Sequence, residues 1–234
     1  MSTVFVVGSL NIDQNVRVSS LPQAGETVRG SDATFSPGGK GGNQAVAAAR
    51  AGAHVKFTGA VGDDSHGRRI LEVLSDARID HSQLRIVGNA PTGTAIIAVD
   101  DRGENQIIVS PGANSSLTAA DVEAGLAAMR AGDVLVLQLE IPTALVRQAA
   151  RTAKSRGAFV ILNAATAPRQ YTETATTIPR DTIARNSFGS VANLSLAAGA
   201  SPTQFIATGR MVKPINVTTT PLTRVGNSLR TRSM

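Results

Sequence analysis

The segment from Ser36 to Ala53 constrains the fold of this chain more than any other part of its sequence. It reads Ser-Pro-Gly-Gly-Lys-Gly-Gly-Asn-Gln-Ala-Val-Ala-Ala-Ala-Arg-Ala-Gly-Ala, so glycines surround Lys40 and an alanine-rich helical pattern follows without a break. Glycine lets the backbone approach a ligand closely, and a helix that begins beside the loop would direct free N–H groups at its contents. Lys40 adds a positive charge, and Asn43 adds a hydrogen-bond donor and an acceptor. We therefore expect a loop that binds a small polyhydroxylated or phosphorylated molecule.

Two other interpretations of this loop are weaker. A nucleotide-binding P-loop places four residues between its first glycine and Gly-Lys, and Ser or Thr follows the lysine to reach a magnesium ion. Here Gly41 follows Lys40, so the P-loop is excluded. A plain glycine-rich turn with a solvent-exposed lysine is the other alternative. Ordering Pro37 to Asn43 costs more backbone entropy than an ordinary connection requires, which favours a binding loop.

Apolar segments and helical patterns alternate along residues 1–166. Strands are predicted at Val4–Val7, Asn15–Val18, Thr27–Thr34, Val55–Val61, Thr92–Val99, Asn105–Ser110, Val134–Leu139 and Phe159–Leu162. Helices are predicted at Asn43–Ala51, at Ser65–Asp76, after the capping box Thr118–Asp121, and from Pro142 to about Lys154. This alternation predicts a parallel sheet covered by helices on both faces. Two hairpin-like insertions, at about 14–34 and 92–110, interrupt it and indicate a lid.

Polar residues follow several of the predicted strands. Asn11 and Asp13 follow the first strand, Glu140 follows the central one, and Asn163 follows another. In a doubly wound sheet, ligands bind outside the carboxyl ends of the strands. Each residue taken alone has a local explanation, because Asp13 could cap a turn, Glu140 the helix after Pro142, and Asn163 a loop. Together with Lys40 and Asn43, they favour a sugar site.

The composition indicates the cellular compartment of the protein. There is no cysteine, which excludes a disulfide framework and a thiolate metal site and suits a reducing compartment. The N-terminus lacks a basic segment before its short apolar run, and no stretch reaches the length of a membrane span. We expect a soluble cytoplasmic protein without a membrane partner.

The positive charge is concentrated in one part of the chain. The net charge is +6, but residues 1–166 hold 15 basic and 15 acidic side chains, so the whole excess lies in residues 167–234. Arginines there stand singly among Thr and Ser, without the stacking or groove-reading element of a nucleic-acid-binding domain. We expect no nucleic-acid partner, and a basic arm that binds nucleic acid is the weakest of the alternatives.

The composition changes sharply after Thr166. Residues 167–234 contain 12 Thr, 6 Ser and 5 Pro, and no helical periodicity is sustained. Such a segment buries too little apolar surface to offset the entropy lost on ordering. We divide the chain into a sugar-binding part, 1–166, and an atypical tail, 167–234. The tail is interpreted either as a disordered extension or as the product of a shifted frame or rearranged end.

Five segments of the first part carry a family resemblance. They are Val6-Val-Gly-Ser-Leu-Asn11-Ile-Asp13, Pro22-Gln-Ala-Gly-Glu-Thr27, Gly38-Gly-Lys-Gly-Gly-Asn-Gln-Ala-Val-Ala-Ala, Gly62-Asp-Asp and Leu137-Gln-Leu-Glu140. Residues 1 to about 166 thereby resemble the N-terminal part of the ribokinase family of carbohydrate kinases, which is related to the bacterial fructose-phosphate kinases. The resemblance implies an α/β fold: a ribokinase-like three-layer sandwich with a parallel central sheet and a small β-lid.

The resemblance also implies a site. The pentose hydroxyls would be bound by Asn11, Asp13, Gly39, Lys40, Asn43 and Glu140. Ala95 and Ile97 would belong to the β-lid that closes over the sugar, and the lid strands would form the surface of a homodimer. ATP and Mg²⁺ are the implied cofactors, with a monovalent cation as a further candidate.

The chain departs from the family in its later half. Members carry a Gly-Ala-Gly-Asp segment that supplies the catalytic base and the anion hole, and this sequence contains none; Ala198-Gly-Ala-Ser201 lacks the carboxylate. The ATP-binding half is therefore missing or replaced, as in a truncated or frame-shifted form. We expect a kinase that transfers phosphate from ATP to O5 of D-ribose or a similar pentose, impaired in this form. The alternative is a non-catalytic remnant that binds a sugar or a partner.

Overall fold

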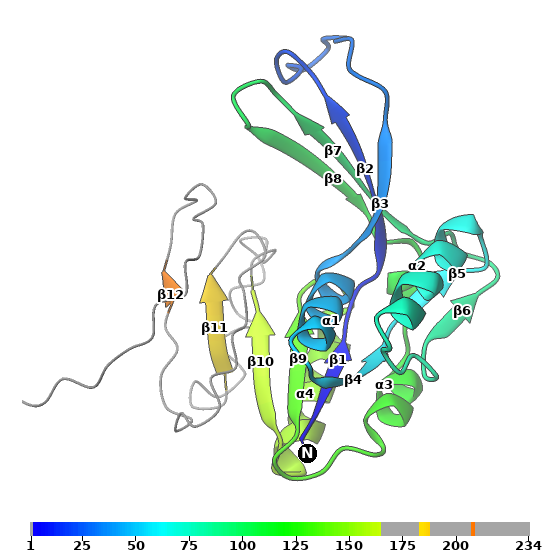
Figure 1. The fold of residues 1–234 in the computed structure, drawn as a ribbon, viewed down its shortest axis with the longest axis vertical. Helices are drawn as coiled ribbons and strands as arrows, with labels where there is room; N and C mark the ends of the chain where they lie inside the picture. The colour runs from blue at the N-terminus through cyan, green and yellow to red at the C-terminus, as the bar shows by residue number, and fades with distance from the viewer. Residues whose placement is uncertain (1, 165–182, 188–206, 209–234) are drawn as a thin grey trace, which may run out of the picture.

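The centre of the fold is a parallel β-sheet (Figure 1). The computed structural model describes residues 2–164, 183–187 and 207–208. Within them, six strands pair in the order β12-β11-β10-β9-β1-β4, and every pairing is parallel. The predicted parallel sheet is confirmed. Its strands are β1 (Thr3–Val7), β4 (His54–Thr58), β9 (Val134–Gln138), β10 (Phe159–Asn163), β11 (Ile183–Ser187) and β12 (Ala207–Thr208).

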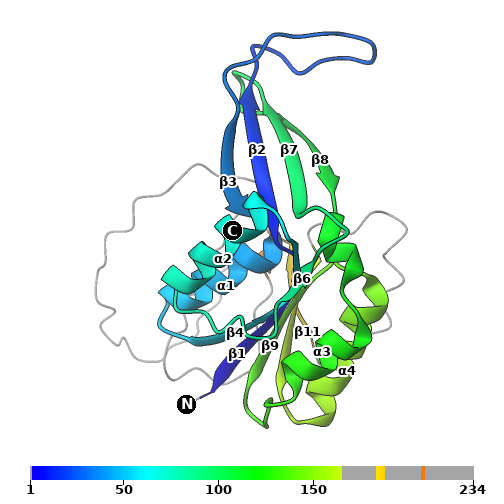
Figure 2. The ribbon, with the colours of Figure 1, turned by 90° about the vertical axis from the view of Figure 1, so that its right-hand side faces the viewer.

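Helices cover both faces of this sheet (Figure 2). One face carries α1 (Lys40–Arg50) and α2 (Ser65–Asp76), and the other carries α3 (Ala119–Leu126) and α4 (Thr143–Ser155). Successive side chains of β9 point to opposite faces. Leu135 and Leu137 pack in the core with α3 and α4, whereas Val136 packs in the core with α1 and α2. Because both faces are buried, the strand is apolar along most of its length. The predicted three-layer sandwich is present.

A second sheet projects as a lid from the end of the first sheet at which β1 finishes (Figure 1). Its order is β3 (Thr34–Gly38), β2 (Asn11–Arg17), β7 (Gly93–Val99) and β8 (Asn105–Ser110). β2 and β7 are parallel, and β7 and β8 form the predicted hairpin. The lid strands therefore lie within 11–38 and 93–110, close to the predicted 14–34 and 92–110.

Two of the predicted lid strands have wrong bounds. The strand predicted at Asn15–Val18 begins already at Asn11, because β2 pairs with β3 and β7 from that residue onward. The strand predicted at Thr27–Thr34 is a loop with a single bridge, between Val18 and Gly30, and regular pairing starts only at Thr34. Residues 29–36 are all exposed, so the weak alternation of residue types there does not correspond to a buried face.

The sandwich elements follow the predictions more closely. α2 has the predicted bounds and is capped by Asp64, and the capping box of Thr118 and Asp121 is present at α3. The strand predicted at Val55–Val61 is two strands, because the chain turns at Gly59 into β5 (Ala60–Gly62), which pairs with β6 (Arg85–Val87). The first helix begins at Lys40 rather than Asn43, since the two glycines after Lys40 pack against the chain at Ser9 and Leu10 as part of the first helical turn.

The division at residue 166 falls at the limit of the described part. Of the predicted tail, only β11 and β12 are described, and β11 extends the sheet by pairing with β10 from Val160 to Asn163. The prediction of a disordered tail otherwise lies outside the described residues. Every helix in the described part is too short or too polar to cross a membrane.

Candidate functional site

The glycine-rich loop lies where the lid joins the sandwich. β3 ends at Gly38, and Gly39, with φ of 84°, leads directly into α1. That φ lies in the left-handed region, which favours glycine. A Cβ on Gly41 would lie 2.6 Å from the backbone nitrogen of Ser9, and a Cβ on Gly38 would lie 2.2 Å from Oδ2 of Asp13. The glycines therefore allow the start of α1 to pack against the end of β1 and beneath the Asp13 carboxylate.

The N–H groups in the first turn of α1 already have partners within the protein. The Lys40 N–H donates to Oε2 of Glu140 at 3.0 Å, and the Gly41 N–H donates to Oγ of Ser9 at 3.3 Å. The Gly42 N–H donates to the Ser9 carbonyl at 3.0 Å. The prediction that this helix directs free N–H groups at a ligand is therefore wrong. The helix N-terminus instead stabilises a protein carboxylate, which favours a neutral hydroxyl-bearing ligand over a phosphorylated one.

Glu140 connects the central strand to this loop. Its Oε1 forms an ion pair with Nζ of Lys40 at 3.0 Å, and its Oε2 also accepts a hydrogen bond from Oγ of Ser9 at 2.7 Å. The Glu140 side chain is 11% exposed and that of Lys40 is 31% exposed, so the pair is only partly screened by water. The local alternative, that Glu140 caps the helix after Pro142, is not what the structure shows: among the described residues, no side chain caps α4.

Asp13 faces this ion pair from the first lid strand. Its pKa is raised above the usual range, mainly by burial and further by the negative charge of Glu140, against the opposing effect of Lys40. Neither carboxylate oxygen of Asp13 accepts a hydrogen bond from the described residues, although the side chain is half-buried. A half-buried carboxylate of this kind has only water to supply donors until a ligand provides them. Hydroxyl groups of a sugar are suitable donors.

Asn11 forms a hydrogen bond with Asn114, a residue that the sequence analysis did not identify. Asn11 is 3% exposed, and its Oδ1 accepts a hydrogen bond from Nδ2 of Asn114 at 2.9 Å. Asn114 lies in the short helix η1 (Gly112–Ser116), directly after the last lid strand. The signal available in the sequence was a polar residue in a Pro-Gly-Ala-Asn segment at the exit of the predicted hairpin.

The remaining predicted residues lie at different distances from this centre. Ala95 is buried and pairs in register with Asp13 across β2 and β7, so both residues face the same side of the lid. Ile97 pairs with Asn15, two residues farther along the lid. Asn43 is exposed on the first turn of α1. The structure thus brings five predicted residues together at the root of the lid, which is where the lid joins the sandwich beside Gly39: Asn11, Asp13, Lys40, Glu140 and Ala95. Ile97 and Asn43 lie at the margins of this group.

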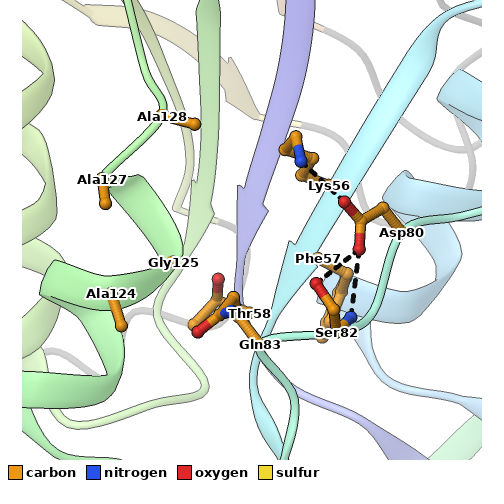
Figure 3. Close-up of a pocket in the computed structure, with 10 residues that line it drawn as sticks. All are labelled: Lys56, Phe57, Thr58, Asp80, Ser82, Gln83, Ala124, Gly125, Ala127 and Ala128. Carbon is orange, nitrogen blue, oxygen red and sulfur yellow. Dashed lines mark hydrogen bonds and ion pairs between the residues drawn. The ribbon is translucent and has the colours of Figure 1, made fainter.

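A separate cavity of about 220 Å³ lies away from these residues (Figure 3). It is bounded by β4, α3 and the segment after α2, and it contains the exposed ion pair of Lys56 and Asp80. None of the predicted site residues lines it. In the described part of the chain, no group of three or more His, Cys, Asp or Glu side chains could hold a metal ion.

Comparison with known proteins gives consistent results. The sequence profile described as pfkB family carbohydrate kinase matches residues 1–180. The ribokinase of Haemophilus influenzae is 40% identical over 165 residues, which cover 70% of this chain and 54% of that protein. The ribokinase of Bacillus subtilis is 39% identical over 167 residues, covering 71% of this chain and 57% of that protein.

Solved structures of ribokinases share the fold. The ribokinase of Cryptococcus neoformans in complex with ADP superposes with a TM-score of 0.69 at 32% identity, covering 78% of this chain and 57% of that one. The Arabidopsis thaliana ribokinase complexed with ribose and ATP gives a TM-score of 0.60 at 35% identity, and the match covers 70% of this chain and 54% of that one. This chain therefore spans about half the length of the relatives it matches.

Proposed function

Because this chain belongs to the pfkB family of carbohydrate kinases, we propose that its described part is the sugar-binding part of a kinase for D-ribose or a similar pentose. The observation that carries the proposal is the half-buried Asp13 carboxylate, which has no hydrogen-bond donor among the described residues and faces the Lys40–Glu140 pair. The ribokinase of Arabidopsis thaliana, whose structure was solved with ribose and ATP, supports ribose as the first sugar to test.

The chemistry of the site suits a polyol. Asp13 would accept hydrogen bonds from two sugar hydroxyls, which would supply the donors that the carboxylate lacks. The Lys40 ammonium group, already paired with Glu140, would donate to a hydroxyl oxygen. Ala95, on the same lid face as Asp13, would give the ring an apolar contact as the lid closes. These contacts bind and orient the sugar, and orientation is the larger part of what a phosphoryl-transfer enzyme must provide.

We propose ATP as the phosphoryl donor and O5 of the sugar as the acceptor, with Mg²⁺ and a monovalent cation as further cofactors. ADP and ATP are present in the two ribokinase structures compared above. In the part of the chain that the structure describes, no group of three or more His, Cys, Asp or Glu side chains could hold the metal ion. The sequence lacks the Gly-Ala-Gly-Asp segment that supplies the base and anion hole. Loss of these groups removes orders of magnitude in rate, so we propose that this chain turns over slowly.

That same absence favours a second function, a non-catalytic protein that binds a sugar or a full-length partner. The lid suggests how a partner would attach, because Phe35, Ile96, Ile107, Ile108 and Val109 are exposed on its strands. The strand register puts Phe35, Ile96 and Ile108 on one face of the lid sheet and Ile107 and Val109 on the other. Exposed apolar side chains grouped on one face in this way indicate a protein interface. We propose a homodimer through the lid, located in the cytoplasm.

Two assays on the purified chain separate the two functions. Titration with D-ribose, followed by isothermal calorimetry, tests the sugar site, and D-glucose and L-arabinose serve as comparison sugars. A coupled assay with D-ribose, ATP and Mg²⁺ tests phosphoryl transfer. Saturable binding with turnover far below 1 s⁻¹, compared with a usual range of about 1 to 10³ s⁻¹, supports the proposal. Normal turnover would show that the chain has a working ATP site, and no binding of any pentose would refute the sugar site.

A further inference from the structure

Three strands of the lid meet the sandwich at one buried side chain. Asn114 is 1% exposed. Its Oδ1 accepts a hydrogen bond from the Leu10 N–H at 2.9 Å, at the start of β2. Its Nδ2 lies 3.0 Å from the Leu10 carbonyl oxygen and 2.9 Å from that of Pro111, which follows β8. Gly93, the first residue of β7, is so close that an added Cβ would lie 2.3 Å from Asn114 Nδ2. Asn114 therefore connects the roots of β2, β7 and β8.

The orientation of the Asn114 carboxamide follows from its partners. A backbone N–H can only donate, so the atom facing the Leu10 N–H must be the oxygen Oδ1. The other atom is then the NH₂ group, whose neighbours are carbonyl oxygens. That group has two hydrogens for three acceptors within 3.0 Å, namely the Leu10 and Pro111 carbonyls and the Asn11 side chain, so one hydrogen is shared. If the amide were flipped, its NH₂ group would face the Leu10 N–H, donor against donor. Its oxygen would then face the carbonyl oxygens of Leu10 and Pro111, acceptor against acceptor.

The orientation of the Asn114 carboxamide determines which polar atom of Asn11 remains available to a ligand. The atom of Asn11 that faces the Asn114 NH₂ group must be an acceptor, so it is Oδ1, at 2.9 Å. The Asn11 Nδ2 is then the other polar atom of the side chain, and it makes no hydrogen bond to the described residues. The polar atom of Asn11 that is left without a partner can therefore only donate to a bound molecule, while the oxygens of the neighbouring ionised Asp13 carboxylate can only accept. The pair presents one donor side chain and one acceptor side chain.

We propose that Asn114 is a positioning residue: it sets Asn11 as a hydrogen-bond donor to the sugar and couples that setting to the root of the lid. This inference rests on the proposed sugar site, because it assigns Asn114 a role in binding there. It adds a residue that touches no ligand and acts through Asn11. It also fixes the kind of ligand group that lies against Asn11, namely an oxygen that accepts a hydrogen bond.

The first test compares Asn11→Asp with Asn11→Ala. Asn11→Asp keeps an acceptor for the Asn114 NH₂ group but replaces the donor that faces the ligand with an oxygen. If Asn11 donates, Asn11→Asp lowers the affinity for D-ribose at least as much as Asn11→Ala, by about tenfold or more. If Asn11→Asp binds ribose as tightly as the unmodified chain, Asn11 accepts from the ligand and the inference is overturned.

The second test is a double-mutant cycle in ribose affinity with Asn11→Ala and Asn114→Ala. Coupled residues give non-additive effects, whereas a general structural effect adds. We expect Asn114→Ala to weaken binding about tenfold in the unmodified chain and less than twofold in the Asn11→Ala background. The control is Asn89→Ala, which removes the same side chain from an exposed turn and should leave affinity unchanged. Additive losses overturn the inference.

A measurement without ligand separates this inference from the sugar proposal. In NMR spectra, Asn114→Ala should shift the side-chain NH₂ resonances of Asn11 and speed hydrogen exchange at the Leu10 amide, which loses its acceptor. If Asn114→Ala is poorly folded, Asn114→Ser serves instead, because its hydroxyl is small enough for the site. Should the unmodified chain bind no pentose, the proposed function fails, while the NMR shifts still decide whether Asn114 positions Asn11. Unchanged Asn11 and Leu10 signals would refute the positioning role.

Discussion

Glu140 both caps helix α1 and neutralises Lys40: its carboxylate accepts from the Lys40 backbone N–H at 3.0 Å and pairs with the Lys40 ammonium group at 3.0 Å. One side chain at the end of the central strand therefore fixes both the backbone and the side chain of the glycine-rich loop. Contacts within the protein therefore hold the loop in place. A loop held in this way would reduce the entropy that the proposed sugar must offset on binding.

Replacing Glu140 tests how much this pairing stabilises the fold. Glu140→Gln removes the charge that opposes Lys40 in a partly buried position, so we expect the free energy of unfolding to fall by about 1–3 kcal/mol. Urea denaturation measures the change. Glu72→Gln is the matched control, because Glu72 pairs with Arg69 at an exposed position and should cost less than about 0.5 kcal/mol. Equal effects of the two variants would contradict the role assigned to Glu140.

Asp13→Asn should separate stability from binding. The raised pKa of Asp13 means that the folded state disfavours its ionised form, mainly because of burial and then because of Glu140. Ionised Asp13 therefore destabilises the fold: the loss of stability is complete above the folded-state pKa and disappears below the unfolded-state pKa. Asn carries no charge, so Asp13→Asn should raise the midpoint of thermal unfolding at pH 7, and the gain should shrink as the pH falls. A lower midpoint at pH 7 would show that the carboxylate is stabilising.

Asp64 should show the opposite dependence on pH. Burial opposes ionisation, but hydrogen bonds from Thr92 and Gly67 outweigh it, so the pKa of Asp64 is lowered. A lowered pKa stabilises the fold above the unfolded-state value, and this stability is lost as the pH falls through the folded-state pKa. We expect Asp64→Ala to cost about 0.5–2 kcal/mol at pH 7, the usual range for a lost helix cap, and less at pH 3. A cost that is constant from pH 7 to pH 3 would speak against ionised Asp64 as the cap.

The close approach at Gly41 predicts that even a methyl group is not tolerated there. A Cβ at this position would meet backbone atoms of Ser9 and Gly8 within 2.8 Å, and backbone cannot move aside cheaply. Gly41→Ala should lower the free energy of unfolding by about 1–3 kcal/mol. Gly88→Ala is the control, because nothing lies within 4 Å of its added Cβ. A Gly41→Ala variant as stable as Gly88→Ala would mean that the loop is less tightly packed than described.

The proposed dimer is tested by placing a charge on the lid. Ile108 is 68% exposed on β8, and Ile86 is 58% exposed on β6, outside the lid. If the lid forms the interface, Ile108→Glu should give a monomer in sedimentation analysis at concentrations where the unmodified chain and Ile86→Glu are dimeric. A dimer that survives Ile108→Glu and dissociates with Ile86→Glu would place the interface elsewhere.

The sequence predicted the sandwich well because its signals are local. The apolar run at Val134–Leu139 and the caps at Asp64 and Thr118 depend on neighbours a few residues away, and all of them match the structure. The lid bounds were less accurate. Thr34–Gly38 pairs with residues that lie 19 to 27 positions earlier in the chain, and nothing in its own pattern marks where pairing begins.

The site shows the same limit. Lys40, Asp13 and Glu140 were found because polar residues at strand ends and beside glycines stand out in a sequence. The use of the α1 N–H groups by Glu140 and Ser9 was missed, since it depends on contacts across 100 and 32 residues, respectively. Asn114 was missed for the same reason, because its partners at Leu10 and Asn11 lie more than 100 residues away along the chain.

The central claim is that Asp13 and the Lys40–Glu140 pair hold a pentose at the root of the lid. Calorimetric titration of D-ribose into the unmodified chain and into Asp13→Asn tests it most directly, with the thermal midpoint of each protein measured alongside. We expect saturable binding by the unmodified chain and affinity at least about tenfold weaker for a folded Asp13→Asn variant. Equal affinity of the two proteins for D-ribose would contradict it.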